Sequence, residues 1–147
     1  MKKLAIILLM ASPALYLFAQ TKPGQTKPAQ AKAAPANELA ASMQRGKVVY
    51  DKVCLSCHMV DGGGVPKLNP PLIQTSYVLG DKTKLILIIL KGMSDRVPIE
   101  DEYYSNTMAS HADLKDQQIA DVLTYVRNSF GNKASAVTAA EVKAVRK

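Results

Sequence analysis

Two cysteines and one histidine within five residues constrain this chain more than any other feature of its sequence. The segment reads Cys54-Leu55-Ser56-Cys57-His58, and the 147-residue chain contains no other cysteine. A spacing of three residues places both thiols on one turn of a helix, and the imidazole that follows projects from the same side. Five consecutive residues therefore present two sulfur atoms and one metal-binding nitrogen to a common partner.

Three chemistries use such a segment. A zinc site needs four ligands, and the sequence adds only the distant His111. An exported thiol–disulfide oxidoreductase uses a C-x-x-C pair, but on a βαβ scaffold that this sequence does not suggest. The pattern C-x-x-C-H is the attachment site of haem c, where each thiol forms a thioether and the histidine ligates the iron. We therefore predict one covalent haem at Cys54, Cys57 and His58, with the oxidoreductase as the alternative.

The first 37 residues are predicted to lie outside the folded domain. Residues 1–19 begin with two lysines and continue with the apolar run Leu4–Phe18. This pattern is typical of a signal peptide and is short for a membrane span, which needs about 20 residues. The alternative is an uncleaved segment that anchors the protein in the inner membrane. Residues 20–37 form a Lys/Pro/Ala-rich flexible linker with almost nothing large and apolar to bury. The sequence therefore predicts export to the periplasm.

The formal net charge of +7 is concentrated in the two ends of the chain. Residues 38–131 hold 10 basic and 11 acidic side chains, whereas residues 132–147 carry a net charge of +3. A nucleic-acid-binding domain concentrates its positive charge on the folded part, so nucleic acid is excluded as a partner. We expect a folded domain over residues 38–131 and a basic C-terminal tail over residues 132–147.

The spacing of apolar residues predicts an all-α domain, because no segment shows the alternation of a strand. Gly46 interrupts the first helix, which indicates close approach by another element. The irregular stretch 93–113 is long for a compact domain and is typical of a functional loop. Helices are predicted over residues 38–53, over 82–91 with Asp81 as its cap and Gly92 at its end, and over 116–130.

The order of these features resembles the class I, mono-haem cytochrome c family. The resemblance covers most of residues 38–131: a helix ending in GKVVY, then CLSCH, a Gly/Pro loop, a middle helix, a methionine loop and a closing amphipathic helix. The C-terminal stretches IADVLTYVRNSFGN and VTAAEVKAVR resemble a bacterial periplasmic branch of cytochrome c subunits and partners of exported dehydrogenases and oxidases. The resemblance implies three to five helices around one haem. Its first and last helices would cross at Gly46, with Tyr50 and Tyr125 packed beside it.

The resemblance also implies a distal methionine ligand to the iron. Met59 directly follows His58 and cannot reach the opposite haem face, whereas Met108 lies at the family's usual distance before the closing helix. We therefore expect His58 and Met108 to be the axial ligands, with Met93 and His111 as the alternatives for the distal position.

In the family, a proline carbonyl in the loop after the motif accepts the second ring N–H of the histidine ligand. Pro70 is expected in this role in preference to Pro71. Histidine and methionine together fill both axial positions, which implies a one-electron carrier and not an enzyme. The expected partners are redox proteins such as a dehydrogenase, a reductase or a terminal oxidase. The alternative is an electron-transfer subunit stably bound to an exported dehydrogenase or reductase.

Overall fold

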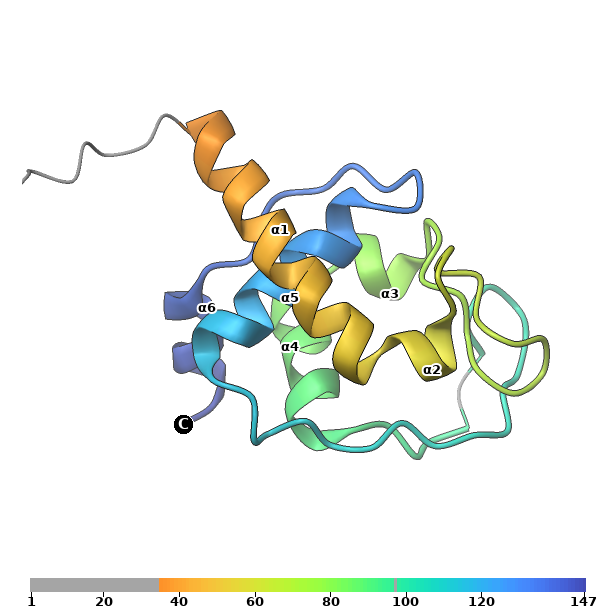
Figure 1. Ribbon diagram of the computed structural model, residues 1–147. Coiled ribbons are helices and arrows are strands. Elements are labelled where there is room, and N and C mark those ends of the chain that lie inside the picture. Colours follow the sequence, from red (N-terminus) through yellow and green to blue (C-terminus); the bar gives the residue numbers. More distant parts are fainter. Residues whose placement is uncertain (1–34, 97) are drawn as a thin grey trace, which may run out of the picture. The chain divides into compact units, whose positions relative to one another are not determined.

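The structure, a computed structural model, describes residues 35–96 and 98–147. The predicted signal peptide 1–19 and most of the predicted linker 20–37 lie outside these residues. The described part confirms the all-α prediction, since its only β pairings are three isolated bridges. No helix of the described part is long and apolar enough to cross a membrane. The helices in Figure 1 are α1 (Pro35–Val53), α2 (Leu55–His58), α3 (Ser76–Leu79), α4 (Lys82–Lys91), α5 (Asp116–Asn128) and α6 (Ala139–Val145).

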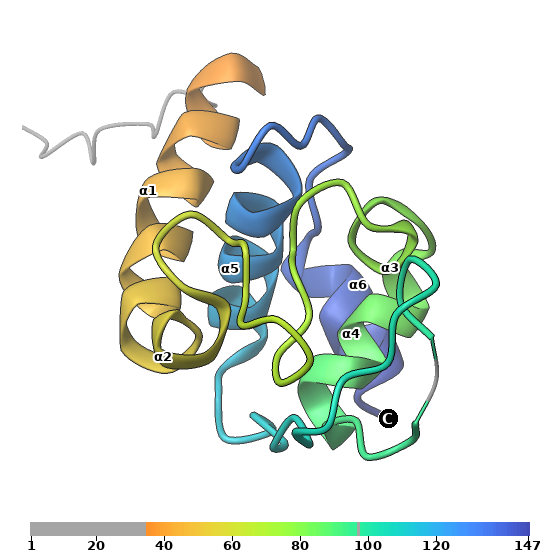
Figure 2. The ribbon, with the colours of Figure 1, turned by 90° about the vertical axis from the view of Figure 1, so that its right-hand side faces the viewer.

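The most extensive helix packing is between α1 and α5, which lie against each other in both views (Figures 1 and 2). A Cβ atom added to Gly46 of α1 would lie 2.0 Å from the carbonyl oxygen of Asp121 and 2.8 Å from Cβ of Tyr125, both on α5. The ring centroids of Tyr50 and Tyr125 are 5.4 Å apart, and Phe130 adds a third ring at 5.5 Å from Tyr50. The predicted close approach at Gly46 and the predicted tyrosine packing are both confirmed.

A buried carboxylate fastens the same crossing. Asp121 is 2% exposed and accepts hydrogen bonds from the Ser42 hydroxyl at 2.7 Å and from Arg45 Nε and Nη2 at 2.7 and 2.9 Å. Gln117, one turn earlier on α5, donates a further bond at 3.0 Å. Burial by itself raises the pKa of Asp121, but the bonds from Arg45, Ser42 and Gln117 outweigh it and lower this pKa below its ordinary value. The carboxylate is therefore charged inside the helix interface.

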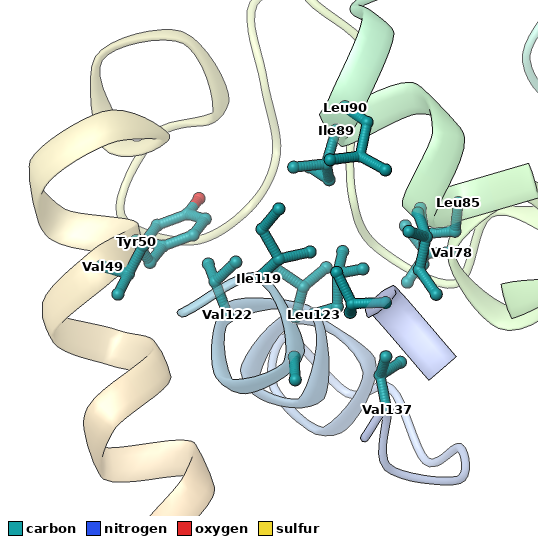
Figure 3. Packing of buried hydrophobic residues seen from close by; sticks show 14 residues of the cluster. Val49, Tyr50, Val78, Leu85, Ile89, Leu90, Ile119, Val122, Leu123 and Val137 are labelled. Carbon is teal, nitrogen blue, oxygen red and sulfur yellow. The ribbon is translucent and has the colours of Figure 1, made fainter. Parts of the chain in front are cut away.

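The hydrophobic core lies between α1, α4 and α5. Figure 3 shows Val49 and Tyr50 of α1 on one side and the apolar face of α4 on the other, with α5 between them. Helix α4 spans its predicted range because the Asp81 carboxylate accepts the Lys84 N–H at 2.7 Å and Gly92, at φ 77°, ends it. The buried cluster comprises Val49, Tyr50, Val78, Leu85, Ile86, Ile89, Leu90, Ile119, Ala120, Val122, Leu123, Val126, Val137 and Val142.

The C-terminal residues 132–147 differ from the expected tail, because they contain α6 and pack on the domain beside α4 and α5 (Figure 2). Thr138 and Glu141 form a capping box: the Thr138 hydroxyl accepts the Glu141 N–H at 3.2 Å, and the Glu141 carboxylate accepts the Thr138 N–H at 2.7 Å. Val142 is completely buried and Val137 is 4% exposed. The folded domain therefore continues past residue 131. Within α6 the charges of Glu141 and Lys143 balance, so the net positive charge of this segment lies on Lys133 before the helix and on Arg146 and Lys147 after it.

Two buried polar side chains connect the end of α5 to distant backbone. Arg127 is 3% exposed and donates to the carbonyl oxygens of Val78 at 2.6 Å, Gly80 at 3.2 Å and Ser135 at 2.9 Å. Asn132 donates to the carbonyl oxygens of Leu72 and Val126 at 2.9 and 2.8 Å. The bonds to Val78 and Val126 satisfy carbonyl groups that would otherwise be buried without a partner. They hold the loops on the α3 side of the cavity described below.

Candidate functional site

The five-residue motif lies where the chain leaves α1 and turns into α2. The N–H groups of Cys57 and His58 both donate to the Cys54 carbonyl oxygen, at 3.1 and 2.9 Å, so the motif forms one helical turn. Cys54, Cys57 and His58 all line one cavity of about 280 Å³. Cys54 is half-buried in this wall and Cys57 is exposed. The structure therefore brings together both thiols and the imidazole, as the spacing predicts.

The imidazole of His58 is oriented by the loop that follows the motif. Its Nδ1 atom lies 3.0 Å from the carbonyl oxygen of Pro70. Because a carbonyl oxygen only accepts, Nδ1 carries the proton and Nε2 is left for a ligand bond. Burial lowers the pKa of His58, while the bond to Pro70 raises it by a smaller amount. The side chain is thus held in the neutral form that binds a metal ion.

Gly64 allows this loop to fold back on itself. Its φ is 68°, and an added Cβ would lie 2.4 Å from the carbonyl oxygen of Asn69 and 2.6 Å from that of Pro70. The N–H of Gly64 also donates to the carbonyl oxygen of His58 at 3.1 Å. A side chain at this position would push the Pro70 carbonyl away from the imidazole. Gly64 is therefore a supporting residue of the site. Its place in the predicted Gly/Pro loop did not indicate this role.

The three candidates for the distal position all reach the same cavity. Met93, Met108 and His111 line it, whereas Met59 is 44% exposed and is not part of its wall. The backbones of Met93 and Met108 exchange two N–H···O bonds, each 2.9 Å, as directly opposed antiparallel residues. Side chains in such a pair lie on the same face of the ribbon. Both thioethers therefore point to one side, and this face borders the cavity.

The methionine loop, which carries Met108 between α4 and α5, is hydrogen-bonded to α4 and to the loop carrying Pro70. The Ser110 hydroxyl donates to the carbonyl oxygen of Leu90 at 2.6 Å, and the His111 N–H donates to that of Ile89 at 2.8 Å. On the other side, the Asn106 amide donates to the Asn69 side-chain oxygen at 3.1 Å. The stretch 93–113, predicted as a functional loop, thus forms one wall of the cavity in its described residues, 93–96 and 98–113. The link between Asn69 and Asn106 has no sequence signal, because the two residues are 37 positions apart.

The surroundings of the thiols do not suit the two competing chemistries. Burial, and secondarily Cys57, raises the pKa of Cys54 to about 11. A catalytic thiol needs the opposite shift, because the thiolate is the nucleophile. Zinc needs four ligands, whereas the motif offers two thiols and one imidazole. Within residues 35–96 and 98–147, no group of three His, Cys, Asp or Glu side chains is placed to hold a metal ion.

The donor set and the cavity wall fit a haem. Two thiols lie on the α2 side together with an oriented imidazole, and thioether sulfur is available from the methionine loop. Most of the remaining wall is aliphatic, as a porphyrin requires. The aliphatic wall residues from α4 and α5 are Leu85, Ile88, Ile89, Val122, Leu123 and Val126. Fold and site together define a c-type haem protein.

Comparison with known proteins gives the family. The sequence profile of the family described as "Cytochrome c" matches residues 43–130. The chain is 32% identical over 117 residues to cytochrome c-552 of Thermus thermophilus, covering 74% of this chain and 78% of that protein. It is 38% identical over 109 residues to the cytochrome c subunit of gluconate 2-dehydrogenase from Pantoea cypripedii, covering 71% of this chain but 24% of that subunit. A cytochrome c subunit of quinone alcohol dehydrogenase from Komagataeibacter europaeus is also 38% identical over 109 residues, with coverage of 69% and 22%.

The chain belongs to the cytochrome c family. It carries haem c and transfers electrons, as predicted from the motif, and does not itself act as a catalyst. The relatives also confirm the predicted likeness to cytochrome c subunits of dehydrogenases.

Proposed function

We propose that this protein is an exported one-electron carrier whose haem is held by Cys54 and Cys57 and ligated by His58 and Met108. The observation that carries the proposal is a single cavity reached by the oriented His58 imidazole from α2 and by Met108 from the methionine loop. Met108 packs against the buried core, so its side chain is held in place at the cavity wall. Met93 and His111 reach the same cavity and are the alternatives that the experiment must separate.

The bound haem supplies a one-electron iron couple, and ligation by methionine raises its reduction potential and leaves no open position for oxygen chemistry. The residues of the chain orient the histidine ligand and exclude water from the haem. The Pro70 carbonyl fixes the tautomer and the plane of His58 and makes the imidazole a more basic ligand. The aliphatic wall excludes water, which disfavours the more highly charged ferric state and so raises the potential further.

We further propose that the partners are redox enzymes outside the cytoplasm. The support is that relatives are named as subunits of gluconate and fructose dehydrogenases and of a cbb3-type cytochrome c oxidase. Export is supported by the predicted signal peptide 1–19. Stable association with one dehydrogenase remains the second candidate, because several relatives are such subunits. Purification of the native protein from the periplasm separates the two: a free carrier elutes alone, whereas a subunit co-elutes with its dehydrogenase.

The attachment site is tested in protein matured in a haem-attaching periplasm. The unsubstituted protein is expected to keep its haem after denaturation and to give the pyridine haemochrome spectrum of two thioethers. The Cys54→Ala/Cys57→Ala variant is expected to retain none. Covalent haem that survived in the double variant would contradict the assignment.

The distal ligand is tested by the weak far-red band that a methionine–ferric haem bond produces. We expect this band in the unsubstituted protein, in Met93→Ala and in His111→Ala, but not in Met108→Ala. Met93→Ala is the matched control, because it removes an identical side chain from the residue paired with Met108. Survival of the band in Met108→Ala, with loss in Met93→Ala, would transfer the ligand role to Met93. Absence of the band from the unsubstituted protein would point to His111, because a haem with two histidine ligands produces no such band.

A further inference from the structure

One guanidinium group at the end of α6 makes three bonds to the turn that leads from the methionine loop into α5. Arg146 donates from Nε to the Asp116 carboxylate at 2.6 Å, from Nη1 to the Ala112 carbonyl oxygen at 2.7 Å and from Nη2 to the Leu114 carbonyl oxygen at 2.6 Å. The side chains of Arg146 and Asp116 are 32% and 29% exposed, so the pair is partly shielded from water. Three nitrogen atoms of one side chain thus hold a turn of five residues.

The helix that carries Arg146 is itself well anchored. Val142 is completely buried, and Val145 packs against the core cluster. Lys82, at the start of α4, bonds to the Glu141 carboxylate at 2.9 Å. The N–H of Arg146 donates to the Val142 carbonyl oxygen at 3.0 Å, so its backbone continues the helical pattern. The backbone that carries the Arg146 side chain is therefore held in place by the packing of α6.

The turn that Arg146 holds is continuous with the residues that face the cavity. Ala112 directly follows His111 and lies four residues after Met108. Within the turn, the Leu114 N–H donates to the His111 carbonyl oxygen at 3.1 Å, which connects the clamped part to the cavity wall. If Ala112 and Leu114 lost their partner, their carbonyl groups would turn to water and the end of the methionine loop would loosen.

We propose that Arg146 is a positioning residue that keeps the methionine loop closed, so that α6 sets how firmly Met108 stays on the iron. This inference rests on the proposed function, since it takes Met108 as the distal ligand. It gives α6 a part in the haem site although no residue of α6 lines the cavity. A small iron ligand such as imidazole binds only when Met108 has left. Its apparent affinity therefore measures the fraction of molecules with an open loop.

The test is an imidazole titration of the ferric, haem-loaded protein, followed by loss of the methionine–iron band. Arg146→Ala is expected to bind imidazole about tenfold more tightly, which corresponds to losing roughly one hydrogen bond to a charged group. Lys143→Ala is the matched control, because it removes one positive charge from an exposed position of the same helix. Arg146→Lys keeps the charge but not the fork of donors, so an intermediate affinity is expected.

Urea unfolding followed by far-UV circular dichroism separates loop opening from unfolding of the whole domain. The band of Arg146→Ala should vanish at a urea concentration well below the loss of helix, whereas the two transitions of the unsubstituted protein lie closer together. Imidazole affinity unchanged in both Arg146 variants, or raised equally in Lys143→Ala, would overturn the proposal. If Arg146→Ala does not fold, Arg146→Lys decides the matter by the same titration. Absence of the band from the unsubstituted protein would instead refute Met108 ligation, and this inference with it.

Discussion

Replacing Gly46 by alanine tests whether contact between two backbones sets the α1–α5 crossing. The new Cβ would lie 2.0 Å from the Asp121 carbonyl oxygen, and real Cβ contacts are essentially never shorter than 3.0 Å, so the helices must separate by roughly 1 Å. Ser42 and Arg45 each lie 2.7 Å from the Asp121 carboxylate. The same movement would carry both beyond the usual hydrogen-bond range of about 2.7–3.2 Å.

The opposing contributions can be compared in magnitude. Alanine favours a helix over glycine by about 1 kcal/mol. Overpacking costs about 1–3 kcal/mol, and each weakened hydrogen bond to a charged group costs up to about 1.5–3 kcal/mol. We therefore expect Gly46→Ala to lower the free energy of unfolding by about 3 kcal/mol net, which lowers Tm by roughly 12 °C for a domain of about 110 residues.

The measurement is urea and thermal unfolding of haem-loaded protein by far-UV circular dichroism. Gln44→Ala is the control, because this exposed position of α1 should change stability by no more than about 0.5 kcal/mol. A Gly46→Ala variant as stable as the unsubstituted protein, or more stable, would refute the reasoning, since helix propensity would then dominate over the backbone contact.

Three further outcomes follow from contacts described above. Asp121 has a lowered pKa in the fold, so its contribution to stability is present above about pH 4 and is lost as the pH falls through that lowered value. In Asp121→Asn, the urea midpoint of unfolding should therefore fall less steeply at acidic pH than in the unsubstituted protein. An equally steep fall in the variant would contradict this role of Asp121. Arg127→Met should cost about 1–3 kcal/mol in urea unfolding, because it leaves the buried Val78 carbonyl group without its donor. A loss below about 0.5 kcal/mol, the level of an ordinary surface change, would mean that water takes the place of the guanidinium. Gly64→Ala should displace the Pro70 carbonyl from His58 and make the imidazole less basic; the reduction potential measured by spectroelectrochemistry is then expected to rise, and a folded variant with an unchanged potential would count against the role of this bond.

The parts of the fold that the sequence predicted are those whose signals are local. Helix α4 begins and ends as expected because Asp81 and Gly92 are adjacent to it. The motif Cys54–His58 needs only five consecutive residues to place its donors on one side. Gly46 could be assigned to a crossing because a glycine inside a helix is costly unless something lies close to it.

The unpredicted parts depend on partners far along the chain. Asp121 lies in an amphipathic helix, where the sequence pattern favours an exposed carboxylate. Its burial depends on α1, which brings Ser42, 79 residues away, into hydrogen-bond contact. Arg127 is paired across 49 residues with the carbonyl of Val78. Residues 132–147 have the sequence pattern of a tail because their four basic side chains stand beside only three apolar side chains larger than alanine. Val142 is buried only because α4 and α5 offer a surface to cover.

The α1–α5 crossing also has a consequence for the order in which the protein is assembled. The bond between Ser42 and Asp121 closes a segment of 79 residues, and both cysteines lie inside that segment. Bringing residues so far apart together costs the chain the freedom of the whole intervening segment. Until this crossing forms, the thiols can be reached on an open chain and can receive their haem. A haem attached at that stage is enclosed when α1 and α5 pack together.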